Sequence, residues 1–233
     1  MEDVRPNEQR AKIAILLIWI IIAIETVKLI SDYLELQLLS KANAGLTITV
    51  EAANANDIRQ QIIAVVYLIV AIVSTVTFIQ WFRRAYYNLH TQIYNLDFEE
   101  GWAAWAWFVP ILNLYRPYKI MKELYHETEN LLSQRIENYI PKDSAALLGV
   151  WWALWIIDSF LGQFMFRYSL RADGVDELIT VSQTSILSSF ISIPLSLIII
   201  RVIKDYAAME TLLYADGIIK EEDDSDIIDS HLT

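Results

Sequence analysis

The chain has 233 residues, of which 55% are hydrophobic, and its formal net charge is -11. Soluble domains are about 45–50% apolar, and the excess here is concentrated in four runs, so we expect one membrane domain. The negative charge argues against a nucleic-acid partner, although much of it lies in the segment EEDDSDIID near the carboxyl end. The absence of cysteine excludes a disulfide framework and thiolate metal sites.

The first apolar run begins at Ile13 and extends to about Tyr33. About 20 helical residues cross the hydrocarbon core of a bilayer, so this run predicts a spanning helix. A signal peptide is the alternative, but the cleavage-like triplet at residues 42–44 lies well beyond the usual distance from the run. We therefore expect an uncleaved helix, then an external loop over residues 40–57 with a short strand at residues 46–50.

A second span is predicted over residues 62–79, which carry no charge, and its helix should continue to Leu89. Asp97 and Glu100 then form a helix-start signal before a tryptophan-rich apolar segment at residues 102–112. Its 11 residues make about half a crossing, and Pro110 removes a backbone donor. We expect a half-helix that lies at the membrane interface or re-enters the bilayer against protein.

An amphipathic helix is predicted over residues 119–140, where apolar side chains recur every three or four positions apart from one longer gap. It lies along the membrane or packs under the bundle, and its mixed charges favour packing. The third span covers residues 145–166, and the fourth covers residues 178–200 with Pro194 inside it. The expected fold is an all-α membrane domain over residues 1–206, followed by an acidic, disordered tail at residues 215–233.

The distribution of basic residues predicts the orientation. Thirteen Lys and Arg residues fall in the two termini and the central loop, against five on the other side. Because cytoplasmic loops are enriched in Lys and Arg, both termini are expected in the cytoplasm, and an even number of spans agrees with this.

Two sequence motifs carry a family resemblance. FIQWFRRAYYNL (residues 78–89) and GWAAWAWFVPILNLYRPYKIMKEL (residues 101–124) resemble the signature of the bacterial membrane-protein family known as domain of unknown function 4328. The matching positions are Trp81, Arg84, Ala85, Tyr86, Asn88, Leu89, Gly101, Trp102, Ala103, Trp105, Phe108, Pro110, Asn113, Leu114 and Pro117. The resemblance covers about residues 62–206. It implies a multi-pass protein of the bacterial inner membrane, and the family has no assigned activity.

A first candidate site lies on the predicted cytoplasmic side, where guanidinium and amide groups suit a lipid headgroup or another anion. Its members are Arg83, Arg84, Asn88, Trp102, Asn113 and Arg116. The alternative is topological, because arginines stop spanning helices on the inside and asparagines hold a bent backbone. That alternative is the favoured one.

A second candidate site consists of Glu25, Lys28 and Asp158, which are ionisable residues inside spanning runs. Such residues are costly in a bilayer and indicate a proton or ion path by default. Glu25 and Lys28 are also three residues apart on one helix, so they can neutralise each other. We favour structural pairing near the outer interface.

No metal-binding histidine spacing, nucleophile motif or phosphate-binding glycine loop is present, so we expect no metal, no cofactor and no enzyme. The first function hypothesis is a non-enzymatic scaffold or regulatory component. It would bind a lipid headgroup or a protein partner through its cytoplasmic face or acidic tail. The alternative is a small channel or transporter that uses Glu25, Lys28 and Asp158. Whether the chain forms a homo-oligomer stays open.

Overall fold

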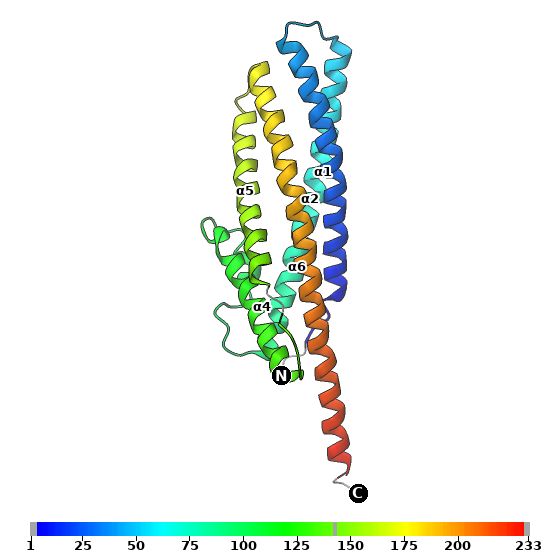
Figure 1. The fold of residues 1–233 in the computed structure, drawn as a ribbon, viewed down its shortest axis with the longest axis vertical. Helices are drawn as coiled ribbons and strands as arrows, with labels where there is room; N and C mark the ends of the chain where they lie inside the picture. Colours follow the sequence, from blue (N-terminus) through cyan, green and yellow to red (C-terminus); the bar gives the residue numbers. More distant parts are fainter. Residues whose placement is uncertain (1–3, 142–143, 231–233) are drawn as a thin grey trace. The chain divides into compact units, whose positions relative to one another are not determined.

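The computed structural model describes residues 4–141 and 144–230, with side chains up to residue 213. The described residues form helices and contain no strand. Four helices are long: α1 (Glu8–Asn43), α2 (Val50–Gln92), α5 (Ala145–Ser169) and α6 (Val175–Ser230). Three further elements follow α2 and precede α5 along the chain (Figure 1): α3 (Trp102–Trp105), η1 (Leu112–Leu114) and α4 (Arg116–Arg135).

Each long helix contains an 18-residue window with a mean hydropathy between 1.6 and 2.8, which makes it long and apolar enough to cross a membrane. The chain is therefore a multi-pass membrane protein with four candidate spans. The prediction of an all-α fold is confirmed, and α2 continues beyond its arginines as expected.

The connection between α1 and α2 is shorter than predicted. The expected loop at residues 40–57 is wrong, because α1 extends to Asn43 and α2 begins at Val50. Gly45 ends α1 with a positive φ of 72°, and the Thr49 hydroxyl accepts a hydrogen bond from the Ala52 N–H at 3.2 Å. These two signals account for the boundaries. The strand predicted at residues 46–50 is also wrong, because it falls across this turn and the start of α2.

The tryptophan-rich segment is not a half-helix. Only one turn, α3, forms over Trp102–Trp105, and the 3₁₀ turn η1 follows. Pro110 interrupts the segment, and Ile111 next to it has a φ of 71°, which a β-branched residue rarely adopts. The predicted start signal is also wrong, because Gly101 occupies the N-cap without a side-chain cap, and the Asp97 N–H donates to the Glu123 carboxylate.

Helix α4 differs in its bounds from the predicted 119–140, and it packs within unit 1. The Tyr86 hydroxyl on α2 donates to the Glu123 carboxylate at 2.6 Å, and the Tyr125 hydroxyl donates to the Val202 carbonyl on α6. Within unit 1 this helix therefore packs against parts of α2 and α6, and its predicted position under the bundle stays a prediction. Its buried residues are Pro117, Ile120, Met121, Leu124, Tyr125, Thr128 and Leu132.

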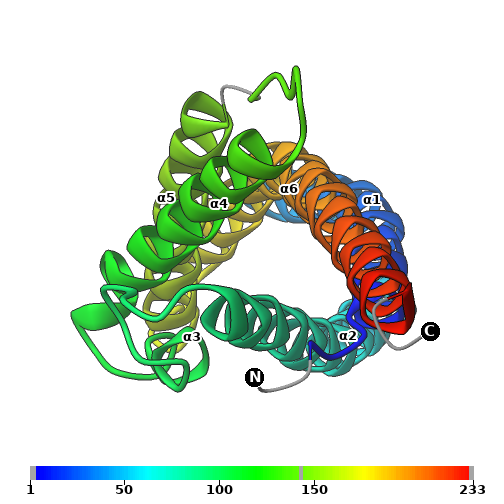
Figure 2. The ribbon, with the colours of Figure 1, turned by 90° about the horizontal axis from the view of Figure 1, so that it is seen from below.

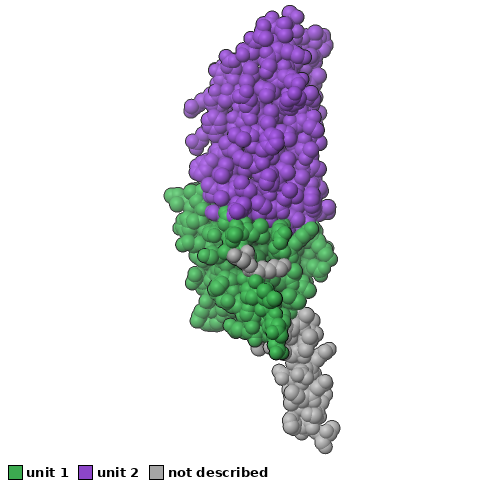
Figure 3. Space-filling model, in the orientation of Figure 1, with its two compact units in different colours: residues 1–13, 77–149, 201–233 green, residues 14–76, 150–200 purple. Residues whose placement is uncertain are grey.

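The chain divides into two compact units (Figure 3). Unit 1 comprises residues 1–13, 77–149 and 201–233, and unit 2 comprises residues 14–76 and 150–200. Residues of the long helices α1, α2, α5 and α6 belong to both units. The single domain predicted for residues 1–206 stays a prediction. The tail predicted at residues 215–233 falls on residues whose side chains lie outside the described part, and its disorder also stays a prediction.

In unit 2, hydrogen bonds join α1 to α6, α1 to α2, and α5 to α6. Helices α1 and α6 lie side by side in both views of the ribbon (Figures 1 and 2). The surface of this unit is apolar, and Leu16, Ile30, Ile62, Leu68 and Phe190 are each more than half exposed. Such a surface suits contact with lipid.

Candidate functional site

The interior of unit 2 is polar. Its buried polar residues are Glu25, Ser31, Asp32, Asn56, Ser74, Ser182, Ser185, Ser189, Ser192 and Ser196. Polar groups of spanning helices normally face the bundle interior, because lipid offers them no hydrogen-bond partners. The unit therefore has the distribution expected of a membrane bundle with a polar centre.

A row of serines on α6 faces carboxylates from α1 and α5. Positions 182, 185, 189 and 192 are three or four residues apart and share one face of the helix. Ser182 donates to Glu35 at 3.0 Å, and Ser185 donates to Asp32. Ser189 donates to Glu25 at 3.0 Å, and Ser192 donates to Asp158 at 2.7 Å. At about 1.5 Å of rise per residue, this hydroxyl–carboxylate row extends over roughly 15 Å of α6.

Lys28 pairs with Asp32, one turn further along α1, at 3.1 Å. Its ammonium group also donates to the Ser185 hydroxyl. The predicted neutralisation of Lys28 by Glu25 is therefore wrong, because the (i, i+4) neighbour Asp32 takes that place.

Glu25 and Asp158 both interact with Tyr67 of α2. The Tyr67 hydroxyl is hydrogen-bonded to Glu25, and Asp158 acts on the same phenol electrostatically. Asp158 also accepts a hydrogen bond from Ser188 at 3.1 Å. Among the described residues, neither carboxylate has a Lys, Arg or His within ion-pair distance.

Further polar side chains extend the row between α1 and α2. Gln60 donates to Glu35 at 2.8 Å. Arg59 donates to the Ser31 hydroxyl at 2.9 Å and to the Asn56 side chain at 2.6 Å. Asp32 and Glu35 were not predicted as members of this cluster. Their signal was present, because positions 25, 28, 32 and 35 of α1 share one helix face.

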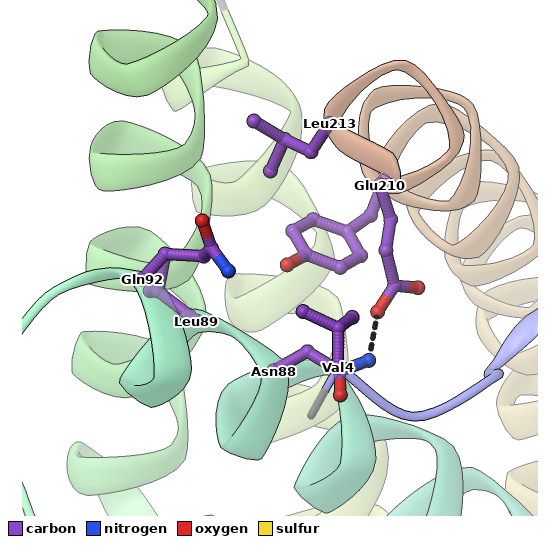
Figure 4. Close-up of a pocket in the computed structure, with 7 residues that line it drawn as sticks. Val4, Asn88, Leu89, Gln92, Glu210 and Leu213 are labelled. Atoms are coloured by element: carbon purple, nitrogen blue, oxygen red, sulfur yellow. Dashed lines mark hydrogen bonds between the residues drawn. The ribbon is translucent and has the colours of Figure 1, made fainter. Parts of the chain in front are cut away.

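In unit 1, Asn88 of the predicted anion site forms a structural tie. It accepts a hydrogen bond from the Arg5 N–H at 3.0 Å and donates to the Arg5 carbonyl at 2.9 Å. It also donates to the buried Glu210 carboxylate at 2.7 Å (Figure 4), which accepts a second hydrogen bond from Asn7 at 3.0 Å. The adjacent cavity of about 20 Å³ is large enough for one water molecule.

Trp102 and Asn113 lie in the segment that connects α2 to α4, and Arg116 is the first residue of α4. The Arg116 guanidinium lies over the Trp102 ring, 4.1 Å from its centroid, which is a cation–π contact. Asn113 belongs to η1 and is half-buried, and the described residues provide no hydrogen bond to its side chain. The role of these three residues in binding stays a prediction.

Arg83 and Arg84 remain together, and they are joined by Arg5 from the segment before α1 and by Arg10 from the first turn of α1. They line a surface depression of about 330 Å³ with Arg5, Arg10, Gln80, Tyr87 and Glu100. We call this feature the arginine depression. Arg5 and Arg10 were predicted only as charges that set the orientation, because no local pattern links them to α2.

The sequence of residues 44–208, more than half of the chain, matches the family model described as Domain of unknown function (DUF4328). The chain belongs to this family. The DUF4328 region begins earlier than the residues 62–206 expected from the motifs. No curated protein and no solved structure matches the chain.

The hydroxyl–carboxylate row and the arginine depression both extend beyond the DUF4328 region. This region supplies the serine face of α6, Asp158 and Arg84, whereas Glu25 and Asp32 of α1 lie outside it. The hydroxyl–carboxylate row therefore combines side chains of the family region with side chains of the preceding helix.

Proposed function

We propose that this DUF4328 protein is a small transporter or channel that carries protons through the interior of unit 2. The observation that carries the proposal is the pair Glu25 and Asp158, two carboxylates in candidate spans that have hydroxyl donors but no cation partner among the described residues. An ionised carboxylate is costly in a medium of low dielectric constant unless it is paired.

The surroundings of this pair support a proton path. A hydroxyl group donates and accepts at the same time, so serine and tyrosine side chains can relay protons between carboxylates. Tyr67 and Ser189 contact Glu25, and Ser185 and Lys28 contact Asp32 further along α1. The positive charges of Lys28 and Arg59 in the same cluster disfavour a metal cation as the transported species.

The proposal places the protein in a bacterial inner membrane with both termini in the cytoplasm, as the distribution of basic residues predicts. It involves no covalent chemistry, and the protein is not expected to be an enzyme. The proton path would connect the cytoplasmic side with the side that carries the turn between α1 and α2.

Proton flux into liposomes that contain the purified full-length protein tests the proposal. We expect an imposed pH gradient to dissipate faster than in empty liposomes. Asp158→Asn and Glu25→Gln should each reduce the protein-dependent rate at least about tenfold, because an amide cannot release a proton. Asp173→Asn, which removes an exposed carboxylate from the connection between α5 and α6, should leave the rate unchanged.

A rate equal to that of empty liposomes would refute the proposal, as would full flux in both amide variants. Asp158→Glu retains a titratable group and should retain part of the flux, which separates a titration requirement from a packing defect. Each variant must elute from size-exclusion chromatography like the wild type before its flux is compared.

The second candidate function is the non-enzymatic scaffold or regulatory role. One observation favours it: Trp105, Phe108 and Ile111 are 67%, 64% and 73% exposed in the segment between α2 and α4. Such an apolar surface suits the bilayer interface or a protein partner. A chain that carries no protons but co-purifies with one partner through these side chains would support this role instead.

A further inference from the structure

We propose that the arginine depression of unit 1 binds the phosphate group of an anionic lipid. This site is independent of the proton path and involves a different set of residues. Of the six residues that sequence analysis assigned to an anion site, only Arg83 and Arg84 belong to it.

The chemistry of the lining favours a phosphate group. Four guanidinium groups, from Arg5, Arg10, Arg83 and Arg84, surround a depression of about 330 Å³. A guanidinium group is a planar fork of N–H donors that matches two phosphate oxygens at once. The single carboxylate of the lining, Glu100, leaves an excess of positive charge there.

Asn88 positions the amino-terminal part of this site. Its side chain bonds both the N–H and the C=O of Arg5, which holds this segment against α2. The Arg5 guanidinium then lies over the Tyr87 ring, 4.3 Å from the centroid. Two segments that are about 80 residues apart in the sequence thereby bring their arginines to one place.

The existing ion pairs leave the site able to accept an anion. Arg83 pairs with Glu100 at 2.8 Å, but its side chain is 55% exposed, and exposed pairs are weak. Arg10 has no ion pair among the described residues. A phosphate dianion can therefore bind to Arg10 without first breaking an ion pair of that residue.

The position of the arginines in the chain favours a lipid as the source of the phosphate. Arg10 lies three residues before the first apolar run, and Arg84 lies five residues after the second. At about 1.5 Å per helical residue, both lie roughly 5–8 Å beyond the apolar runs, where lipid phosphates are found. Free inorganic phosphate has the same chemistry and is the alternative source.

Binding to the delipidated full-length protein in a neutral detergent tests the site. Short-chain phosphatidic acid is titrated against phosphatidylcholine, whose phosphate carries a compensating cation. We expect phosphatidic acid to bind more tightly, and Arg10→Gln and Arg84→Gln each to weaken its binding about tenfold through loss of a charge-assisted contact. Arg201→Gln is the matched control, because it removes an exposed arginine at the end of another apolar run.

Equal weakening by Arg201→Gln, or no weakening by Arg10→Gln, would overturn the proposal. A second arm titrates inorganic phosphate. Binding with the same dependence on Arg10 and Arg84 would assign the site to free phosphate, whereas lipid binding alone would assign it to the membrane. Binding of neither ligand would overturn the proposal.

If Arg84→Gln fails to fold, Arg10→Lys keeps the test decisive. This change retains the charge but removes the planar fork, so we expect a partial loss of phosphatidic acid binding and unchanged thermal unfolding. Wild-type affinity in this variant would overturn the bidentate geometry. Proton flux should be unaffected by all these changes, so this test is separate from that of the proposed function.

Discussion

Asn88 illustrates how much one buried side chain can hold together in unit 1. Its carboxamide both donates and accepts, so it can bond an N–H group, a carbonyl and a carboxylate at the same time. It links the amino-terminal segment through Arg5 and helix α6 through Glu210. The motif YYNL predicted an important asparagine, but not which segments it joins.

We predict that Asn88→Ala lowers the free energy of unfolding by roughly 2–4 kcal/mol, because it removes three hydrogen bonds and takes a donor from the buried Glu210 carboxylate. Thermal unfolding of the full-length protein in detergent measures the effect. Asn113→Ala is the matched control and should cost less than about 0.5 kcal/mol. Similar losses in the two variants would contradict the structural tie.

Helix α4 carries one tyrosine, Tyr125, on its buried apolar face. Tyr125 is buried, and its hydroxyl reaches the backbone carbonyl of Val202 on α6. Burial raises the pKa of this phenol above its ordinary value of 10.0, and the nearby carboxylates of Asp205 and Glu129 raise it further. The phenol therefore stays protonated and keeps its hydrogen bond at any pH at which the protein is normally studied.

We predict that Tyr125→Phe makes stability less sensitive to alkaline pH. Below pH 10 the phenol is protonated in both states, so the contribution of Tyr125 to stability is complete. Above pH 10 the unfolded phenol ionises while the folded one resists, so the wild type loses up to about 1.4 kcal/mol more per pH unit than the variant. Unfolding of both proteins between pH 8 and about pH 11 measures the difference. Parallel curves would refute the assigned pKa shift.

The segment between α2 and α4 shows a limit of helix prediction. Trp102, Trp105 and Trp107 suggested a half-helix, but only one turn forms. Trp107 anchors the segment, because its indole N–H donates to the Ala103 carbonyl at 3.1 Å and its ring contacts Phe78 and Phe82. Side-chain packing, and not helix length, holds this segment in place.

At the scale of the whole molecule, the orientation in the membrane is the main expectation. The turn between α1 and α2 and the connection between α2 and α3 are predicted on opposite sides of the bilayer. The apolar run of α2 lies between them and crosses the membrane once. The chain contains no cysteine, so single-cysteine variants report on one position each.

We predict that Thr47→Cys reacts with a membrane-impermeant maleimide on intact bacterial cells, whereas Asn95→Cys reacts only after the membrane is permeabilised. Both residues lie outside the long helices, and neither is buried. Equal labelling of the two variants in detergent solution is the control for the reactivity of their thiols. The opposite labelling pattern would reverse the orientation, and labelling of both residues on intact cells would exclude it.

The four spans, the continuation of α2 beyond its arginines and the family membership could all be predicted from the sequence. Each depends on a local signal: apolar runs of the length of a bilayer, or rare residue types at fixed spacings. The candidate sites were predicted less well. Glu25, Lys28 and Asp158 were recognised as intramembrane charges, but their partners Asp32, Ser189 and Ser192 were not identified.

The sequence by itself determined which segments enter lipid, because the free energy of burying a run of side chains in hydrocarbon depends on that run alone. Only the tertiary structure decided what each polar group contacts. Glu25 and Ser189 are 164 residues apart, and Arg5 and Asn88 are 83 residues apart. Such pairs form when the helices pack and rotate their polar faces together, and no local pattern of residues encodes that rotation.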